Sequence, residues 1–328
     1  MFFEDLELRR PDHVLGVDTS SLGHVLGDTL IKSEEVMRHE QPDAVLVLGD
    51  TNSCIAAVMA KRLRIPVYHM EAGNRCFDEN VPEETNRRLV DHVADFNLAY
   101  TEHARRNLLA EGLHPQRILV TGSPMGEVLE HYRAGIEASD ALGRLDLEPD
   151  QYFLVSAHRE ENVDSPERLG QLLDCLRAVR ERWDQRVVVS THPRTRKRLA
   201  ELPGSTAIDG VEFMEPFGFL DYNRLQMGAT CVLSDSGTIS EESSILGFPA
   251  ITLRESIERP EALDTGSIVM TGLDAGDVVA AVSEVTSEWE SASSRPLPAG
   301  YEVTNTAERT CRFILSTARR HAASAGIR

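Results

Sequence analysis

The feature that most constrains the fold is a regular alternation of short apolar segments with helical patterns of roughly ten residues, beginning at Ala44. Apolar runs such as 45–49 (VLVLG) and 152–156 (YFLVS) are typical of buried strands. Strands that alternate with helices predict parallel βαβ units, and hence an α/β fold with doubly wound sheets. The alternation occurs in two series separated by the helix 124–134 and the polar stretch 135–150, which we interpret together as a linker. A chain of 328 residues is long enough for two such domains.

The expected strands are 45–49, 66–70, 96–100 and 117–121 in the first series, and 152–156, 186–190, 211–214, 230–234, 249–253 and 267–270 in the second. The expected helices are 23–38, 53–63, 83–94, 102–111 and 124–134, then 166–182, 194–201, 219–227, 238–246 and 275–289, with a last helix over 303–320. For the helix 166–182, Ser165 suits the N-cap position and Pro166 the first turn.

We therefore expect two Rossmann-like domains, an N-terminal one over 1–148 and a C-terminal one over 149–302. The C-terminal helix, 303–328, is expected to complete the N-terminal domain. A doubly wound domain usually opens with a strand and a glycine-rich turn. The first clear strand here follows a helix, so we expect the N-terminal domain to lack its first strand in this chain.

Net charge excludes two classes of partner. The chain has 34 Lys and Arg against 53 Asp and Glu, a formal charge of −19, so nucleic acid and anionic membranes should repel it. No apolar run approaches the ~18 residues that span a bilayer. The five cysteines are scattered without metal-ligand spacing, which indicates reduced thiols in a cytoplasmic protein without a metal centre.

Carboxylates follow the first two strands. Asp50 ends the first and Glu71 the second, and Glu83 and Glu84 come directly ahead of Arg87 and Arg88. Ligands of parallel sheets bind at the carboxyl ends of the strands, so these acids are candidates for acid/base groups in a cleft. Alternatively, Asp50 caps the helix that follows it. The glutamates would then lie on the solvated first turn of the helix 83–94, and the arginines would form surface pairs with them.

A second candidate site is the stretch VLSDSGTISEES, 232–243. A buried strand ends in Asp-Ser-Gly and a helix begins at once, so free backbone N–H groups and the helix dipole favour a phosphate. Ser236 can add a hydroxyl, Gly237 allows close approach, and Glu241 or Glu242 suits ribose hydroxyls. The alternative is an ordinary helix cap.

Two histidines follow strands of the same series, His158 beside Arg159 and His192 beside Arg194. Such pairs can bind phosphate or transfer protons. A single histidine is more often structural, but two at equivalent strand ends favour a functional interpretation.

The motifs GDTNS, HMEAGNR, VPEETNRRLVDH, AHREEN, THP, SDSGTISEE and ERPEA, in this order over about 45–272, resemble those of the non-hydrolysing UDP-N-acetylglucosamine 2-epimerases. The resemblance implies a two-domain glycosyltransferase-B-like fold with a UDP-sugar in the cleft. It also implies inversion at sugar carbon 2 by elimination and re-addition of UDP, through a 2-acetamidoglucal. No cofactor and no metal is implied, and a homodimer is expected because members are commonly dimers.

The resemblance also implies roles for individual residues. The catalytic residues would be Asp50, Glu71, Glu83 and His192. The substrate and UDP contacts would come from Arg87, His158, Arg159, Ser236, Gly237, Thr238 and Glu242.

The sequence departs from the family pattern in several places. The family usually opens with a strand and a GTRPE-like loop that supplies an Arg and a Lys to the substrate. This chain has no such loop and begins roughly 40–50 residues late by comparison. Asn74, Cys76, Glu160, Thr238 and Ser240 replace common family residues.

These variants resemble the branch that forms UDP-N-acetyl-L-fucosamine from UDP-2-acetamido-2,6-dideoxy-L-talose. Three functions therefore stay open: 2-epimerisation of UDP-GlcNAc to UDP-ManNAc as first choice, the same chemistry on the 6-deoxy sugar, or a UDP-sugar-binding protein or glycosyltransferase without epimerase activity.

Overall fold

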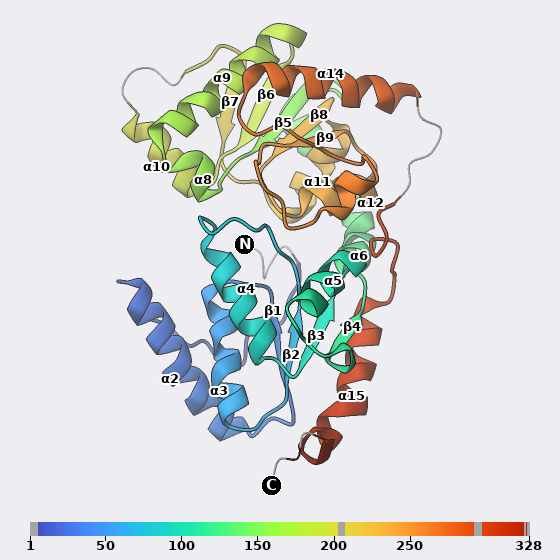
Figure 1. Ribbon diagram of the computed structural model, residues 1–328. Helices are drawn as coiled ribbons and strands as arrows, with labels where there is room; N and C mark the ends of the chain where they lie inside the picture. Colours follow the sequence, from blue (N-terminus) through green and yellow to red (C-terminus); the bar gives the residue numbers. More distant parts are fainter. Residues whose placement is uncertain (1–5, 203–206, 292–296, 325, 327–328) are drawn as a thin grey trace. The chain divides into compact units, whose positions relative to one another are not determined.

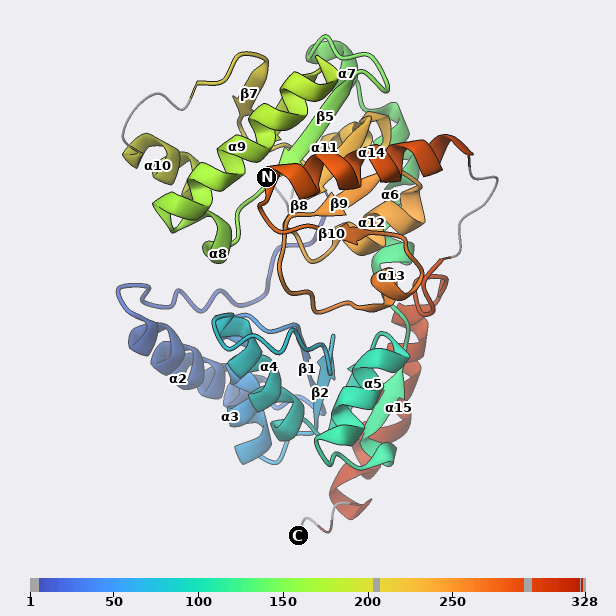
Figure 2. The same ribbon diagram turned by 45° about the horizontal axis from the view of Figure 1, so that its top comes forward.

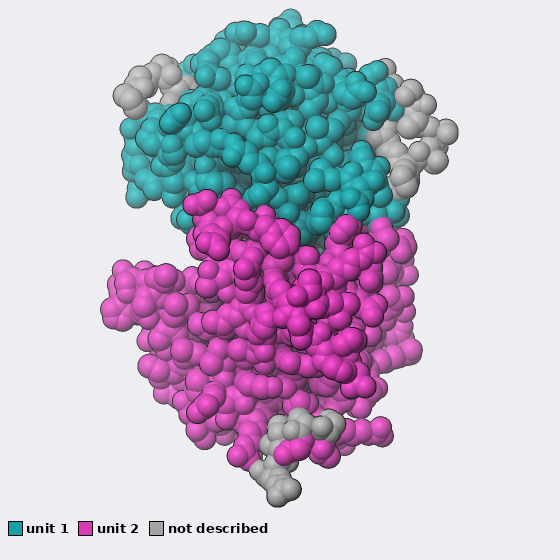
Figure 3. Space-filling view, viewed as in Figure 1, with its two compact units in different colours: residues 1–9, 128–298 teal, residues 10–127, 299–328 magenta. Residues whose placement is uncertain are grey.

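Two separate parallel sheets form the framework of the chain in a computed structural model that describes residues 6–202, 207–291, 297–324 and 326. The chain divides into two compact units, coloured separately in Figure 3. Unit 1 comprises Met1–Arg9 and Val128–Pro298, and unit 2 comprises Arg10–Glu127 and Ala299–Arg328. The C-terminal segment 299–328 thus belongs to the same unit as 10–127. The division falls at 127/128, whereas we expected 148.

The sheet of unit 2 has the order β1-β2-β3-β4, with all described neighbours parallel (Figure 1). Its strands are β1 (Val45–Leu48), β2 (Val67–Met70), β3 (Phe96–Ala99) and β4 (Ile118–Val120). Leu48 pairs with Met70, so the carboxyl ends of β1 and β2 lie next to one another. No strand precedes β1 within residues 6–44, and its side chains Leu46 and Leu48 are exposed.

Alternate residues of β2 face opposite sides of this sheet, as the period of a strand requires. Tyr68 stacks on Phe96, both rings meet Phe313 of α15 (Thr306–Ser324), and the Tyr68 hydroxyl lies 2.6 Å from Oγ1 of Thr317. The neighbouring His69 faces α4 (Pro82–Val93), where it meets Asp91. The other helices of this unit are α2 (Leu22–Glu40), η1 (Asn52–Ile55), α3 (Ala56–Arg62), α5 (Glu102–Ala110) and η2 (Pro115–Arg117).

The sheet of unit 1 has the order β10-β9-β8-β5-β6-β7, again parallel throughout. Its strands are β5 (Tyr152–Ser156), β6 (Arg186–Ser190), β7 (Val211–Met214), β8 (Cys231–Ser234), β9 (Ala250–Thr252) and β10 (Val269–Met270). The chain order reverses between β5 and β8. In open α/β sheets, ligands bind at the carboxyl ends of the strands beside such a reversal.

Residues of β5 fill two cores in turn. Phe153 and Val155 pack with α9 (Pro166–Trp183) and α14 (Ala275–Ser291), which lie side by side in Figures 1 and 2. Tyr152 and Leu154 pack on the other side, with α11 (Phe219–Gly228) and α12 (Ile239–Leu246) among others. Short helices complete the unit: α7 (Ala141–Arg144), α8 (Glu160–Val163), α10 (Pro193–Glu201) and α13 (Glu261–Asp264). Ser165 caps α9 and Pro166 begins it, which confirms that prediction.

The expected linker over 135–150 is wrong in its first half. Helix α6 (Met125–Ala138) continues through Gly135, and α7 follows it. The Tyr132 ring packs edge-on against Phe219, and the Ser139 hydroxyl lies 2.6 Å from Oδ1 of Asp221. These contacts with α11 explain why this stretch belongs to unit 1. Within the described residues, no helix combines the length and apolar character needed to cross a membrane.

The packing of α15 generates a stability prediction. Phe313→Ala should lower the free energy of unfolding by about 2–3 kcal/mol, because it removes a partly buried ring and its edge-to-face contacts with Tyr68 and Phe96. Leu315→Ala on the same helix is the control, because that side chain is 80% exposed and should change the value by less than about 0.5 kcal/mol. Urea denaturation followed by circular dichroism measures both. Equal effects would show that α15 does not pack through this face.

Candidate active site

A buried carboxylate organises the strand ends of unit 2. Asp91 on α4 has no solvent exposure and lies 2.8 Å from Nδ1 of His69 and 2.8 Å from Nη1 of Arg75. It also accepts a hydrogen bond from the backbone N–H of Gly73 at 3.1 Å. The other ring nitrogen of His69 lies 2.9 Å from the carbonyl oxygen of Gly49. One helix side chain therefore holds the turns after both β1 and β2.

The backbone of these turns is specialised. Gly49 and Gly73 have φ angles of +72° and +83°, and a Cβ on Gly73 would lie 2.3 Å from the carbonyl oxygen of Ala104. Only glycine fits there. Glu71 itself has φ +67°, a strained conformation that clusters at functional sites. Asn74 donates a hydrogen bond to its carboxylate at 3.3 Å.

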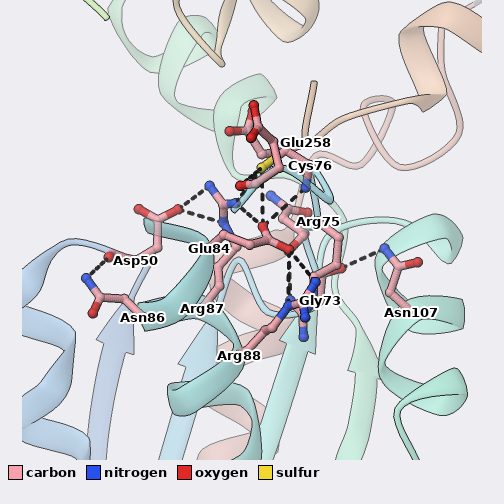
Figure 4. A network of polar contacts seen from close by, with 12 residues as sticks. Asp50, Gly73, Arg75, Cys76, Glu84, Asn86, Arg87, Arg88, Asn107 and Glu258 are labelled. Carbon is pink, nitrogen blue, oxygen red and sulfur yellow. Dashed lines mark hydrogen bonds and ion pairs between the residues drawn. The ribbon is translucent and has the colours of Figure 1, made fainter. Parts of the chain in front are cut away.

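Asp50 does not serve as an ordinary helix cap. Its Oδ2 accepts hydrogen bonds from Nε of Arg87 at 2.8 Å and lies 2.7 Å from Nη2 (Figure 4). No hydrogen bond from the described residues reaches its other oxygen, Oδ1. Burial raises the pKa of Asp50, Arg87 opposes the rise, and the carboxylates of Glu71 and Glu83 add to it. Glu71 and Glu83 therefore both lie within electrostatic range of Asp50.

The two glutamates at the start of α4 differ in their surroundings. Glu83 is half-buried and makes no hydrogen bond or ion pair with other residues of the described ranges. Glu84 is buried and contacts Arg87, Arg88 and Cys76. Arg88 is 44% exposed and forms the helical surface pair that the sequence allowed, whereas Arg87 is buried and orients a carboxylate. The family resemblance assigned the catalytic role to Glu83, whereas the local sequence pattern alone did not distinguish the two glutamates.

In unit 1 another buried carboxylate occupies the carboxyl end of β8. Asp235 accepts hydrogen bonds from the backbone N–H groups of His158 and Arg159 at 3.0 Å and from the side chain of Asn162 at 3.1 Å. These donors lie in the loop after β5 and in the short helix α8 that follows it, so Asp235 joins the two strands that flank the reversal. Sequence reasoning missed this role, although the Asp lies directly beside the predicted phosphate site.

The two predicted histidines meet in this unit. Their rings lie 5.8 Å apart, centre to centre. Nδ1 of His158 lies 3.3 Å from Oδ1 of Asp235, and Nδ1 of His192 accepts the backbone N–H of Arg194 at 3.2 Å. His192 therefore also caps α10, the structural role that the sequence left open. Burial lowers the pKa of His158, with Arg159 and His192 acting in the same direction against Asp235.

Ser236, Gly237 and Thr238 form the turn between β8 and α12. The Ser236 hydroxyl lies 3.0 Å from Oγ1 of Thr238, which occupies the N-cap position. A Cβ on Gly237 would lie 3.5 Å from Nη2 of Arg159, so that guanidinium adjoins the turn. A helix start, two hydroxyls and a cation suit a phosphate group.

The structure distinguishes the two acids of α12. Glu241 forms an ion pair with Arg259, whereas Glu242 accepts a hydrogen bond from Gln226 at 2.7 Å. Burial raises the pKa of Glu242, although hydrogen bonds from Gln226 and Thr238 oppose the rise. Within the described residues, no cation pairs with Glu242. A carboxylate of this kind suits the neutral hydroxyl groups of a ribose. The described residues contain no group of three or more His, Cys, Asp or Glu placed to hold a metal ion.

Comparison with known proteins identifies the family. Residues 1–315 match the family described as UDP-N-acetylglucosamine 2-epimerase. A UDP-N-acetylglucosamine 2-epimerase of Methanocaldococcus jannaschii is 37% identical over 289 residues, covering 86% of this chain and 79% of that relative. The chain belongs to the UDP-N-acetylglucosamine 2-epimerase family.

Solved structures of the family agree with the fold. The UDP-N-acetylglucosamine 2-epimerase of Rickettsia bellii superposes with a TM-score of 0.92 at 42% identity, covering 99% of this chain and 87% of that one. The Methanocaldococcus jannaschii enzyme in complex with UDP-GlcNAc and UDP gives a TM-score of 0.89 at 34% identity, covering 96% and 87%. These neighbours confirm the predicted glycosyltransferase-B-like class and the resemblance. They do not specifically support the fucosamine-forming branch.

Burial of Glu242 leads to a pH prediction. Its pKa is higher in the folded protein than in the unfolded chain, so the unfolded chain releases the proton first. Stability should therefore fall as pH rises from about 4.3, the pKa of a free glutamate, through the folded value. Glu242→Gln removes this loss, so its free energy of unfolding should rise relative to wild type with increasing pH.

Denaturant titrations at a series of pH values measure this difference. Glu148→Gln, at an exposed site of the same unit, is the control and should show no such trend. A difference between Glu242→Gln and wild type that is constant with pH would contradict the prediction.

Proposed function

We propose that this protein interconverts UDP-N-acetylglucosamine and UDP-N-acetylmannosamine by inverting carbon 2 of the sugar. The observation that carries the proposal is the gathering of Asp50, Glu71 and Glu83 at the ends of β1 and β2 and the start of α4. Inversion needs a base on one face of the sugar and an acid on the other, and carboxylates gathered at one site can supply both.

The proposed reaction proceeds through elimination. A carboxylate removes the proton on carbon 2, the electron pair forms the double bond between carbons 1 and 2, and the carbon 1–oxygen bond to UDP breaks. This leaves a 2-acetamidoglucal and free UDP. UDP then adds back to carbon 1 while a proton is delivered to the opposite face of carbon 2. Atoms and charge balance without a redox cofactor. Asp50, Glu71 and Glu83, with His192, are the proposed acid/base residues.

We assign UDP to unit 1. The turn 236–238 would bind the pyrophosphate together with Arg159 and His158, and Glu242 would bind the ribose. Arg87 is proposed to act on the substrate through Asp50, which it contacts. That the Methanocaldococcus jannaschii neighbour is a complex with UDP-GlcNAc and UDP supports this choice of ligand.

Solvent exchange tests the mechanism. In deuterated water, wild type should introduce deuterium at carbon 2 of UDP-GlcNAc, whereas Asp50→Asn and Glu71→Gln should lower that rate by about 10²–10⁴-fold, as loss of general acid/base catalysis does. The mutants should still bind UDP in calorimetry. Glu79→Gln, at an exposed position of the same loop, is the control and should keep the wild-type rate.

The outcome separates the three function classes. Turnover without deuterium at carbon 2 would reject the elimination mechanism. UDP binding without any turnover would favour a binding protein. Sugar transfer that survives Asp50→Asn would favour a glycosyltransferase.

The identity of the UDP-sugar substrate, the location of the protein in the cell and its oligomeric state are predictions. UDP-GlcNAc is the first choice because the relatives carry that name, and the 6-deoxy-L-talose sugar should be assayed beside it. A cytoplasmic location is supported by five free cysteines. The expected homodimer can be tested by light scattering.

A further inference from the structure

We propose that Glu84, held by Cys76, is a positioning residue that fixes Arg87 so that Asp50 presents one oxygen to the sugar. This inference rests on the proposed function, because it assigns a role within the same acid/base site. The family resemblance assigns no catalytic or substrate-binding role to Glu84 or Cys76.

Arg87 connects two carboxylates. Its side chain is 4% exposed, and its Nη1 donates a hydrogen bond to Oε2 of Glu84 at 2.7 Å (Figure 4). Its Nε and Nη2 lie on the other side of the guanidinium, at 2.8 and 2.7 Å from Oδ2 of Asp50. Because the guanidinium is planar and rigid, fixing one nitrogen on Glu84 fixes the direction of the others.

Glu84 is itself held from several sides. The backbone N–H and the thiol of Cys76 both donate to Oε2, at 3.2 and 3.3 Å, and Nε and Nη2 of Arg88 donate to Oε1 at 3.2 and 3.1 Å. Burial raises the pKa of Glu84, but the hydrogen bonds from Cys76 and Arg87 outweigh it and lower the pKa overall. The carboxylate therefore stays charged and keeps its ion pair with Arg87.

The consequence lies at Asp50. Arg87 occupies only Oδ2, and Oδ1 receives no hydrogen bond from the described part of the chain. Without Glu84, the guanidinium would no longer hold Oδ2 in one direction, so Oδ1 would lose its fixed orientation toward the sugar. Holding Arg87 on Glu84 prevents this while the positive charge still favours the ionised form of Asp50.

Two substitutions of Glu84 separate orientation from charge. Glu84→Ala removes the ion pair that orients Arg87 toward Asp50, so the pKa of Asp50 should rise under the influence of burial and of Glu71 and Glu83. We expect kcat to fall about 10–100-fold, KM to stay within about threefold, and the acid limb of kcat/KM to move to higher pH. Glu84→Gln keeps an acceptor for Arg87, so it should retain kcat within about threefold without that upward shift.

Cys76 gives an independent comparison. Cys76→Ser keeps a donor to Glu84 and should behave like wild type, whereas Cys76→Ala should show a smaller version of the Glu84→Ala shift. Lys61→Met controls for stability alone, because it breaks the ion pair with Asp95 elsewhere in unit 2. It should lower the unfolding midpoint and leave the pH profile unchanged.

Carboxyl NMR titration of Asp50, assigned with Asp50→Asn, provides a readout without substrate. An upward shift of the Asp50 pKa in Glu84→Ala supports the proposal even if no sugar is turned over, in which case the proposed function alone fails. A downward shift in Glu84→Ala would show a charge effect without reorientation and would overturn the proposal. Lower stability with an unchanged titration and pH profile would also overturn it.

Discussion

The buried carboxylate of Asp91 is the interaction on which the acid site of unit 2 depends. It contacts the side chains of His69 and Arg75 and accepts a hydrogen bond from the backbone N–H of Gly73. His69 in turn contacts the carbonyl oxygen of Gly49. A buried charge destabilises a protein unless its partners stay in place. Removing one partner typically lowers the free energy of unfolding by about 3–5 kcal/mol. The contacts of Asp91 therefore hold the turns that carry Asp50 and Glu71 against α4, the helix that carries Glu83 and Arg87.

Unit 1 also has a buried carboxylate that holds a loop, and it lies beside a different set of side chains. Asp235 at the end of β8 holds the loop after β5 through backbone N–H groups of His158 and Arg159. Each unit thus places a desolvated acid at the carboxyl ends of its strands and uses it to shape a neighbouring loop. In unit 2 the loop presents further acids, as proton transfer requires. In unit 1 the same edge gathers histidines, an arginine and a helix start, as an anion requires.

Much of this could be read from the amino-acid order because the signals are local. Apolar runs and turn residues predicted the ten described strands to within two residues at their ends, and Ser165 and Pro166 marked the start of α9. The linker expected over 135–150 was wrong in its first half, because α6 continues to Ala138 and α7 begins at Ala141. Contacts with Phe219 and Asp221, far along the chain, hold them in unit 1.

The sequence by itself determined the fold class, the family and the positions of the candidate acids, because strand periodicity and ordered motifs depend only on near neighbours. The tertiary structure decided which partners each of these residues contacts. Glu84 is buried against Arg87 while Glu83 makes no such pair, and Glu241 pairs with Arg259 while Glu242 does not. Adjacent glutamates look alike in local sequence patterns, and only the packing of distant segments pairs Glu241 with Arg259 and Glu242 with Gln226.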